Sequence, residues 1–371
     1  MIRFATLLAV FSSAGCHALL GIDDFSTADA SIDVPMPDTF VVDARSCFGT
    51  LTRICIAPPA LGTIIVAGIL NTSSDPRCDV HSQAGGPDLC VIAGGQISIE
   101  NTLVTGSRAL VFIGTGNITV NASLEASSKR GGQTGAGAAT QPCAPTQTGQ
   151  NDPAGAGGGA GGSYGARAGA GGPGDIASGT TGGVAVAPID PLLVRAGCAG
   201  GNGGVGIELG GTGGASGGVI ALLSGSQISI IAAGSVYASG AGGGAGTVHS
   251  GGGGGGSGGL IVLDAPSIQV LGKVVANGGG GGAGGDSGTG QPGGDGTTTT
   301  IGVPATGGAG EDSTHGGPGG NGAALGQLAT TGAVSPSITG GGGGGGGGTG
   351  VIWVHGTLAG GTMMSPAAAL H

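Results

Sequence analysis

Aromatic and charged side chains are scarce in this chain of 371 residues. Aromatic residues make up 2% of the sequence and charged residues 8%, and twenty acidic side chains outnumber ten basic ones. Proteins that bind nucleic acid need a basic surface and, for single strands, rings on which the bases stack. The composition therefore excludes nucleic acid as a partner.

The chain also lacks the residue patterns of a catalytic or metal site. Asp264 and Lys273 are isolated charges that we interpret as solvated strand edges, and Asp190 lies in a Pro-Ile-Asp-Pro turn, where aspartate is common. The histidines near the glycine loops lack the spacing of a ligand set: His249, His315 and His355. The two carboxylates that a glycosidase needs cannot be placed. We assign no catalytic residue, no metal and no cofactor, and predict that the protein is not an enzyme.

A hydrophobic run long enough to span a membrane is absent from the N-terminal segment. Residues 1–3 give a short basic start, and the apolar stretch 4–11 is too short for a membrane-spanning helix. The Ser-Ala-Gly-Cys sequence at 13–16 resembles a bacterial lipoprotein signal, although such signals usually carry leucine in place of Ser13. The resemblance implies cleavage before Cys16 and a lipid on that residue. Ordinary signal cleavage followed by secretion is the alternative.

The seven cysteines contain no Cys-x-x-Cys pair, so zinc or thioredoxin-like chemistry has no support. If Cys16 carries a lipid, six cysteines remain, and these can form three disulfides in an oxidising compartment. Fifteen connectivities are open to six cysteines. Proximity in the sequence favours three pairs: Cys47 with Cys55, Cys78 with Cys90, and Cys143 with Cys198.

Short strands separated by corners recur along the chain, most completely from Gly258 to Asn277. In each copy one set of alternate positions is aliphatic while the other varies, which predicts that only one face of the strands is buried. From Ile97 to Ile118 the copies follow each other almost without a loop, giving a unit of 21 residues (118 minus 97), a solenoid-scale period. The pattern predicts an all-β fold, a parallel β-helix of about five to six coils with long glycine-rich loops on one edge. An antiparallel β-sandwich with glycine hairpins is the alternative.

Ninety-five glycines, gathered mostly in long tracts, separate these copies. The tracts start directly after the Ala-Ser or Ala-Asn that ends a coil, so we expect them to leave from one corner of the fold. Two interpretations stay open: flexible, disordered loops, or a packed bundle of extended helices of the polyproline type. The repeated Gly-Gly-Ala-Gly-Gly motifs resemble glycine-rich repeat proteins of bacterial surfaces, including the PGRS type, but the PE domain that heads that family is absent.

Two isolated features suggest ligands. The segment from Gly281 to Asp286 partly resembles a calcium-binding nonapeptide, but it lacks the large apolar residue after the aspartate and any tandem copy, so we assign no metal to it. Trp353, the single tryptophan, lies outward in the final copy. It is suited either to stack on a sugar or to cover the end of the solenoid.

These observations predict both a domain organisation and a function. The expected segments are a signal peptide (1–15), a lipidated N-terminus with an acidic tether (16–57), first coils (58–127), a glycine-rich insertion (128–215), further coils with glycine-rich loops (216–358) and a C-terminal tail (359–371). We expect a cell-surface lipoprotein with a structural or adhesive role, and a carbohydrate-binding or carbohydrate-active β-helix is the alternative. Its partners would be the membrane, through the lipid anchor at the outer membrane or cell surface, and surface polysaccharide or other surface proteins.

Overall fold

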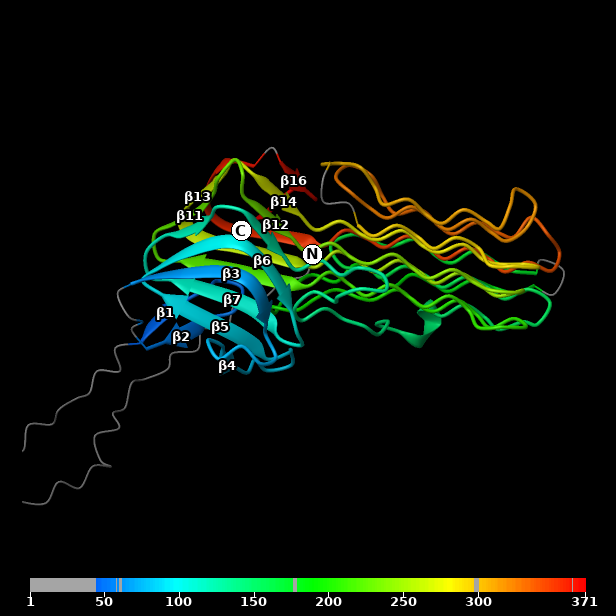
Figure 1. Cartoon of the computed structure of the whole chain (residues 1–371), viewed down its shortest axis with the longest axis horizontal. Helices are drawn as coiled ribbons and strands as arrows, with labels where there is room; N and C mark the ends of the chain where they lie inside the picture. Colours follow the sequence, from blue (N-terminus) through cyan, green and yellow to red (C-terminus); the bar gives the residue numbers. More distant parts are fainter. Residues whose placement is uncertain (1–44, 58, 60–61, 176–178, 297–299, 362) are drawn as a thin grey trace, which may run out of the picture. The chain divides into compact units, whose positions relative to one another are not determined.

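The computed structural model describes residues 45–371, apart from 58, 60–61, 176–178, 297–299 and 362. The described part is all-β, as predicted, and its only helix is a single 3₁₀ turn, η1 (Pro145–Gln147). It contains no helix that is long and apolar enough to cross a membrane. Most strands belong to one large, mainly parallel sheet (Figure 1).

The strands of this sheet stack in three columns. The first column contains β5 (Leu89–Gly94), β7 (Ala109–Gly114), β10 (Val219–Ser224) and the first halves of β13 (Leu260–Val270) and β15 (Val351–Gly360). The second contains the first halves of β3 (Thr63–Asn71) and β6 (Gln96–Thr105), then β8 (Ile118–Val120), β11 (Gln227–Ile230) and the second halves of β13 and β15. The third contains the second halves of β3 and β6, then β9 (Ser123–Glu125), β12 (Ser235–Tyr237), β14 (Lys273–Val275) and β16 (Met364–Ser365).

Equivalent residues of successive copies lie in register, as the repeat predicted. Ile118 pairs with Ile97 on one side and with Ile228 on the other, and Ile228 pairs with Ile268. Their side chains belong to one buried aliphatic core. Among the described strands, antiparallel pairing is confined to β1 with β2 and to β4 (Asp79–His81) with β5. The antiparallel sandwich is therefore not the observed arrangement.

The first column is buried on both faces, which contradicts the expectation of a single buried face. Its outward residues Val111, Ala221 and Val262 are at most 1% exposed and form a second apolar cluster. The hairpin of β1 (Ser46–Phe48) and β2 (Ile54–Ile56) contributes to this cluster, as does the loop that carries Val194. From the sequence, these residues were expected to lie in the tether, which was predicted to run to residue 57. The hairpin belongs instead to the folded body, because the outward aliphatic side chains need a cover.

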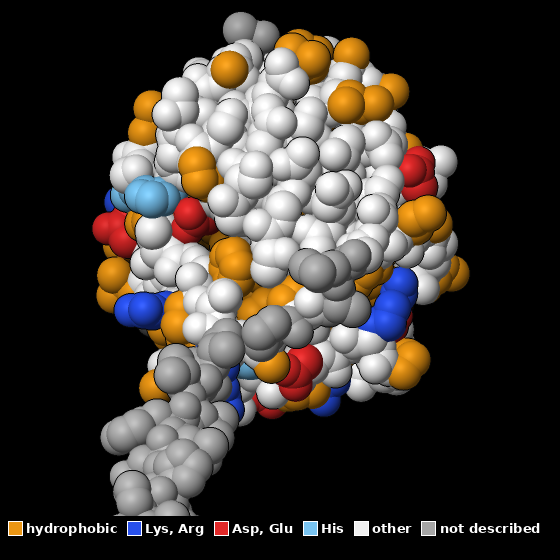
Figure 2. Space-filling model, turned by 90° about the vertical axis from the view of Figure 1, so that its left-hand side faces the viewer, with side chains coloured by type: hydrophobic (Ala, Val, Ile, Leu, Met, Phe, Trp, Pro, Cys, Tyr) orange, Lys and Arg blue, Asp and Glu red, His pale blue; other side chains and the backbone are white. Residues whose placement is uncertain are grey.

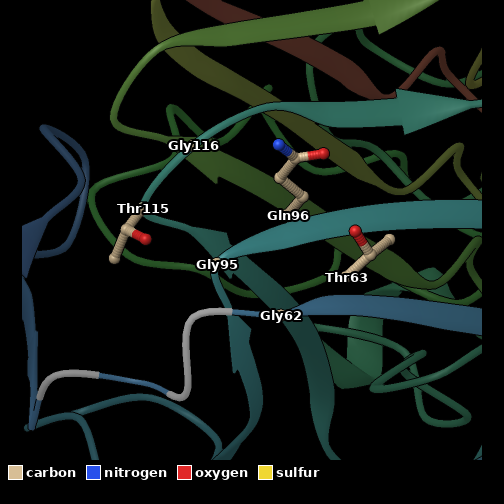
Figure 3. A pocket seen from close by; sticks show the side chains of 6 residues that line it. All are labelled: Gly62, Thr63, Gly95, Gln96, Thr115 and Gly116. Carbon is tan, nitrogen blue, oxygen red and sulfur yellow. The ribbon is translucent and has the colours of Figure 1, made fainter.

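The outward face of the second column is uncharged and mostly polar, with the exposed Ile65 of β3 at its edge. Ser98, Thr119, Ser229 and Gln269 are paired in register across it and are partly exposed. Figure 2 looks at the side of the molecule opposite the glycine segments, where white, uncharged side chains and backbone dominate and the charged side chains lie towards the margins. A shallow cavity of about 370 Å³ opens at one corner of this face, lined by Gly62, Thr63, Gly95, Gln96, Thr115 and Gly116 (Figure 3).

The segment from 359 to 371 was expected to be a tail outside the coils, and that expectation is wrong. β15 continues to Gly360, β16 pairs with β14, and β17 (Ala369–Leu370) pairs with β15. Met364 is 3% exposed and packs into the aliphatic core. These residues add a last layer that covers core side chains otherwise open to water at the end of the stack.

The glycine segments leave from one corner, as predicted. They start after the buried alanines Ala126, Ala238 and Ala276, and they lead back into β10, β13 and β15, whose first residues are paired in register. Figure 1 shows the segments running side by side away from the strands. We call the segments between 145 and 350 that extend in this way the glycine bundle.

The glycine bundle is packed by backbone hydrogen bonds rather than left as loose loops. Between residues 157 and 162, successive N–H groups donate to three different neighbouring segments, and the order of neighbours repeats after three residues. The acceptor carbonyls are those of Gln150, Gly172 and Gly252, then Gln147, Gly169 and Gly255. A period of three is that of an extended polyproline-type helix, which has no hydrogen bonds of its own. Of the two open interpretations, the packed bundle is therefore the one observed in the described residues.

Dense packing explains why these positions are glycine. A Cβ atom built on Gly158 would overlap the carbonyl oxygen of Gly343, and one on Gly254 would overlap the carbonyl oxygen of Ala160. The obstacle in each case is neighbouring backbone, which cannot rotate away as a side chain can. Glycine is required at these positions because the neighbouring segments lie too close for a Cβ atom.

Candidate functional site at the end of the glycine bundle

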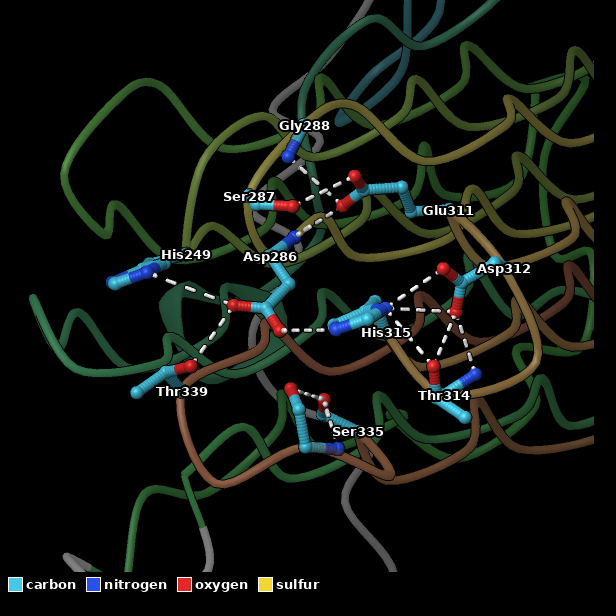
Figure 4. Close-up of polar contacts among 11 residues, drawn as sticks. His249, Asp286, Ser287, Gly288, Glu311, Asp312, Thr314, His315, Ser335 and Thr339 are labelled. Carbon is cyan, nitrogen blue, oxygen red and sulfur yellow. Dashed lines mark hydrogen bonds and ion pairs between the residues drawn. The ribbon is translucent and has the colours of Figure 1, made fainter.

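Polar side chains gather where segments of the glycine bundle reverse direction. The interior of the bundle offers almost no side chains, so its chemistry is confined to its turns, which favour polar residues. We call one group of these residues the distal turns (Figure 4). They are His249, Asp286, Ser287, Glu311, Asp312, Thr314, His315 and Thr339.

Asp286 lies at the centre of the distal turns and is 5% exposed. Its Oδ1 accepts a hydrogen bond of 2.9 Å from the hydroxyl of Thr339. Two imidazoles face the same carboxylate from different turns: Nε2 of His249 is 3.6 Å from Oδ1, and Nε2 of His315 is 4.0 Å from Oδ2 (Figure 4). Asp286 thus connects three turns that are distant in sequence.

The other ring nitrogen of each histidine fixes how the imidazole is presented. Nδ1 of His249 lies 2.9 Å from the carbonyl oxygen of Pro153, which only accepts, so Nδ1 carries the proton. Nδ1 of His315 lies 2.8 Å from the carboxylate of Asp312 and donates to it. Both rings therefore direct Nε2 towards Asp286. When Nε2 of His315 is also protonated, that ring becomes a cation beside a buried carboxylate.

Hydrogen bonds within the distal turns shift three pKa values. The backbone N–H of Thr314, followed by the ring of His315, holds the pKa of Asp312 below its ordinary value. The same contact with Asp312 raises the pKa of His315. The pKa of Glu311 is lowered, mainly because the backbone N–H of Gly288 donates to its carboxylate. The carboxylates of Glu311 and Asp312 therefore stay ionised to lower pH than usual, and the His315 ring beside them stays protonated to higher pH than usual.

Three carboxylates of the folded body, those of Asp264, Asp286 and Asp295, have different surroundings. Asp286 lies in the distal turns, whereas Asp295 accepts hydrogen bonds from the backbone N–H groups of Arg130 and Gly242. Asp264 lies on β13 beside β15. Within the described residues, no three histidine, cysteine, aspartate or glutamate side chains are grouped as metal ligands.

Asp264 is not the solvated edge that its isolation in the sequence suggested. It is 9% exposed and accepts two hydrogen bonds of 2.7 Å from Thr50, one from the backbone N–H and one from the hydroxyl. Nδ1 of His355 lies 3.1 Å from its other oxygen. The carboxylate joins the β1–β2 turn to the sheet, so the interpretation of Asp264 as a solvated strand edge was wrong.

Trp353 lies on β15 at the edge of the second apolar cluster. Its ring stacks on that of His371, with centroids 3.3 Å apart and planes 9° from parallel. Together with Asp190, Pro191 and Leu192, these rings line a cavity of about 420 Å³. One face of the indole is therefore covered by the chain itself, which leaves less of the ring available to a sugar than the sequence suggested.

Three disulfides are present in the described residues, and all are pairs favoured by sequence proximity. They join Cys47 to Cys55, Cys78 to Cys90, and Cys143 to Cys198. Three disulfides indicate an oxidising, extracytoplasmic compartment. Cys16, the signal segment and most of the acidic tether lie outside the described residues.

Sequence reasoning missed the distal turns. It treated His249 and His315 as ordinary loop residues and considered Asp286 only as part of a doubtful calcium motif. The available signal was position: each of these residues lies near the middle of a glycine tract, where the chain must turn back. Comparison with protein families, with curated proteins and with solved structures finds no match for this chain.

Proposed function

We propose that this chain is an exported, non-enzymatic surface protein in which a parallel β-helix carries the glycine bundle as a rigid arm. The distal turns would make the adhesive contacts. The observation that carries the proposal is the glycine bundle itself: it consists mostly of glycine, its described segments are joined by backbone hydrogen bonds, and its turns carry a connected polar cluster. An arm of this kind is suited to holding the distal turns away from the strands.

The β-helix part of the proposal is supported by the three columns of strands. Successive copies pass through the first, second and third column in the same order, and β13 and β15 each run from the first column into the second without a break. Stacked parallel strands at equivalent positions are what about five to six coils of a solenoid require.

The anchoring part of the proposal places a lipid on Cys16 and a tether from there to about residue 45. The protein would then reside at the outer membrane or cell surface, where surface polysaccharide or other surface proteins are available. Replacing Cys16 with serine should release the protein from the membrane fraction. A Cys16→Ser chain that stays in that fraction would exclude the lipid anchor.

Adhesion by the distal turns is tested with the full chain displayed on bacterial cells. Glu311→Lys and Asp312→Lys reverse the charge of two carboxylates in the distal turns, and Asp190→Lys makes the same change in an exposed loop beside the strands. We expect attachment between cells to fall with the first two substitutions and to persist with the third. Equal attachment by all three variants would refute a role for the distal turns.

A further inference from the structure

The outward face of the second column carries two rows of uncharged polar side chains, which we call the polar face. The inner row is Ser98, Thr119, Ser229 and Gln269, paired one to the next across neighbouring strands. The outer row lies two residues earlier along the chain and extends one strand further at each end, to β3 and β15. It consists of Thr63, Gln96, Asn117, Gln227, Ser267 and Thr357.

Most of these side chains have hydrogen-bonding capacity that the protein does not use. Ser98 contacts Asn121 and Glu100. In the described part of the chain, the side chains of Thr119, Ser229 and Gln269, and those of the outer row, form no hydrogen bond with protein. The polar face therefore offers hydroxyl and amide groups to whatever lies against it.

The offered groups repeat at regular intervals. Neighbouring strands in a sheet are about 4.8 Å apart, and alternate residues along a strand are about 6.6 Å apart. Because the strands are paired in register, their side chains repeat at the same two spacings. We call this regular array of side chains the grid. A grid of weak, equal contacts favours a partner that is itself periodic, because many weak contacts then act together.

The composition of the polar face limits the partner further. Neither row contains an acidic or basic residue, so nothing in them would bind a polyanion by charge. Neither row contains an aromatic residue. The inner row continues on β3 with Ile65, which pairs with Ser98 and is 66% exposed, so this edge offers a single aliphatic side chain rather than a set of anchors for an apolar peptide. The face is the broad side of paired strands, so a peptide cannot add to it as a further strand.

We propose that the polar face binds a neutral polysaccharide chain, with sugar hydroxyls exchanging hydrogen bonds with the two rows. Ice is also periodic and uncharged, but the long amide side chains of Gln96, Gln227 and Gln269 adopt many rotamers, which suits varied sugar hydroxyls better than a rigid lattice. The shallow cavity beside Thr63 and Gln96 continues the grid at one corner (Figure 3). This site is separate from the distal turns and does not depend on the proposed function.

The test measures retardation of the purified chain in native gels that contain a soluble neutral polysaccharide: hydroxyethylcellulose, mixed-linkage β-glucan or dextran. Thr119→Arg and Ser229→Arg place a long cation in the middle of the grid. Tyr237→Arg makes the same change on β12, at an outward, partly exposed position of the third column. We expect retardation by at least one neutral polymer and roughly tenfold weaker binding in the two face variants. Tyr237→Arg should bind as the parent chain does.

Several outcomes would overturn the proposal. These are no retardation by any of the three neutral polymers, retardation only by polygalacturonate, or equal loss in Tyr237→Arg. Inhibition of ice growth that disappears in Thr119→Arg, without any saccharide binding, would assign the face to ice instead. A thermal unfolding curve for each variant separates lost binding from lost folding. Ser229→Ala, which leaves the grid sterically open, should weaken binding only a few-fold.

Discussion

The strand columns and the glycine bundle are both stacks of parallel or antiparallel segments, but they are stabilised by different parts of the chain. In the columns, side chains such as Phe112 and Ile118 fill the space between strands and are fully buried. In the glycine bundle, the absence of side chains lets the backbones approach until N–H and carbonyl groups meet directly. Segments can therefore be held in fixed positions either by buried apolar side chains that fill the space between them or by the absence of side chains, which lets their backbones form hydrogen bonds. The two regions should therefore respond oppositely to added and to deleted carbon atoms.

Deleting volume should damage the columns most. Phe112 lies in the centre of the aliphatic core and is 0% exposed. Phe112→Ala removes a buried ring and leaves a cavity, which should lower the free energy of unfolding by about 3–5 kcal/mol. Urea unfolding followed by circular dichroism measures this loss. A change below about 1 kcal/mol would mean that the core does not control the stability of the columns.

The disulfide at the base of the glycine bundle should have a comparable effect on the bundle. Cys143 and Cys198 close a loop with a sequence separation of 55. By the chain-entropy relation, opening a loop of this size with Cys143→Ser and Cys198→Ser together should cost about 4 kcal/mol. Limited proteolysis should then cleave first within 145–200. The matched control is the double variant Cys47→Ser and Cys55→Ser, which opens a loop with a sequence separation of only 8. It should leave residues 145–200 protected from the protease.

Adding volume should damage the glycine bundle and leave the columns intact. Gly158→Ala introduces a Cβ that overlaps the carbonyl oxygen of Gly343, so we expect a loss of about 1–3 kcal/mol from overpacking. Gly132→Ala is the control, because its new Cβ would meet Lys129 only at an ordinary contact distance of 3.5 Å. Hydrogen exchange should show faster exchange in the bundle for Gly158→Ala alone. Equal exchange in the two variants would contradict the packed arrangement.

The smallest expected effect is a pH dependence confined to the distal turns. The pKa of His315 is raised by Asp312, so its stabilising contribution is complete below the unfolded-state value of about 6.5 and is lost as the pH rises through the folded-state value. The pKa of Asp312 is lowered, so its contribution is present above about 3.9 and is lost on acidification. Amides of the distal turns should therefore exchange most slowly between these limits.

Substitution of His315 sharpens this prediction. His315→Gln keeps a hydrogen-bond donor but cannot become a cation, so the upper limit of the slow-exchange window should disappear while the lower limit remains. An NMR titration of the His315 ring in the parent chain gives the folded-state pKa directly. A value at or below that of a model peptide would contradict the contact with Asp312.

Much of the architecture was determined by the sequence alone. Alternating aliphatic residues that recur at equivalent positions favoured stacked strands over a sandwich of hairpins, because stacking places like residues over one another. The cysteine spacing favoured the observed pairs, and the fixed position of the glycine tracts after the last strand of each copy predicted that they leave from a common side. These inferences succeeded because each rests on neighbours in sequence or on exact repetition.

The tertiary structure alone decided the rest, because it depends on contacts between segments far apart in the chain. The outward Val111, Ala221 and Val262 were apolar in the sequence, but only the hairpin at 46–56 showed what covers them. The sequence did not decide whether the glycine tracts are ordered, since their composition fits both a loose loop and a packed bundle. The hydrogen bonds that order them come from neighbouring segments, which only the tertiary structure identifies. The distal turns exist for the same reason: His249 comes from one glycine tract and Asp286 and His315 from another, and they meet only when the two tracts are folded side by side.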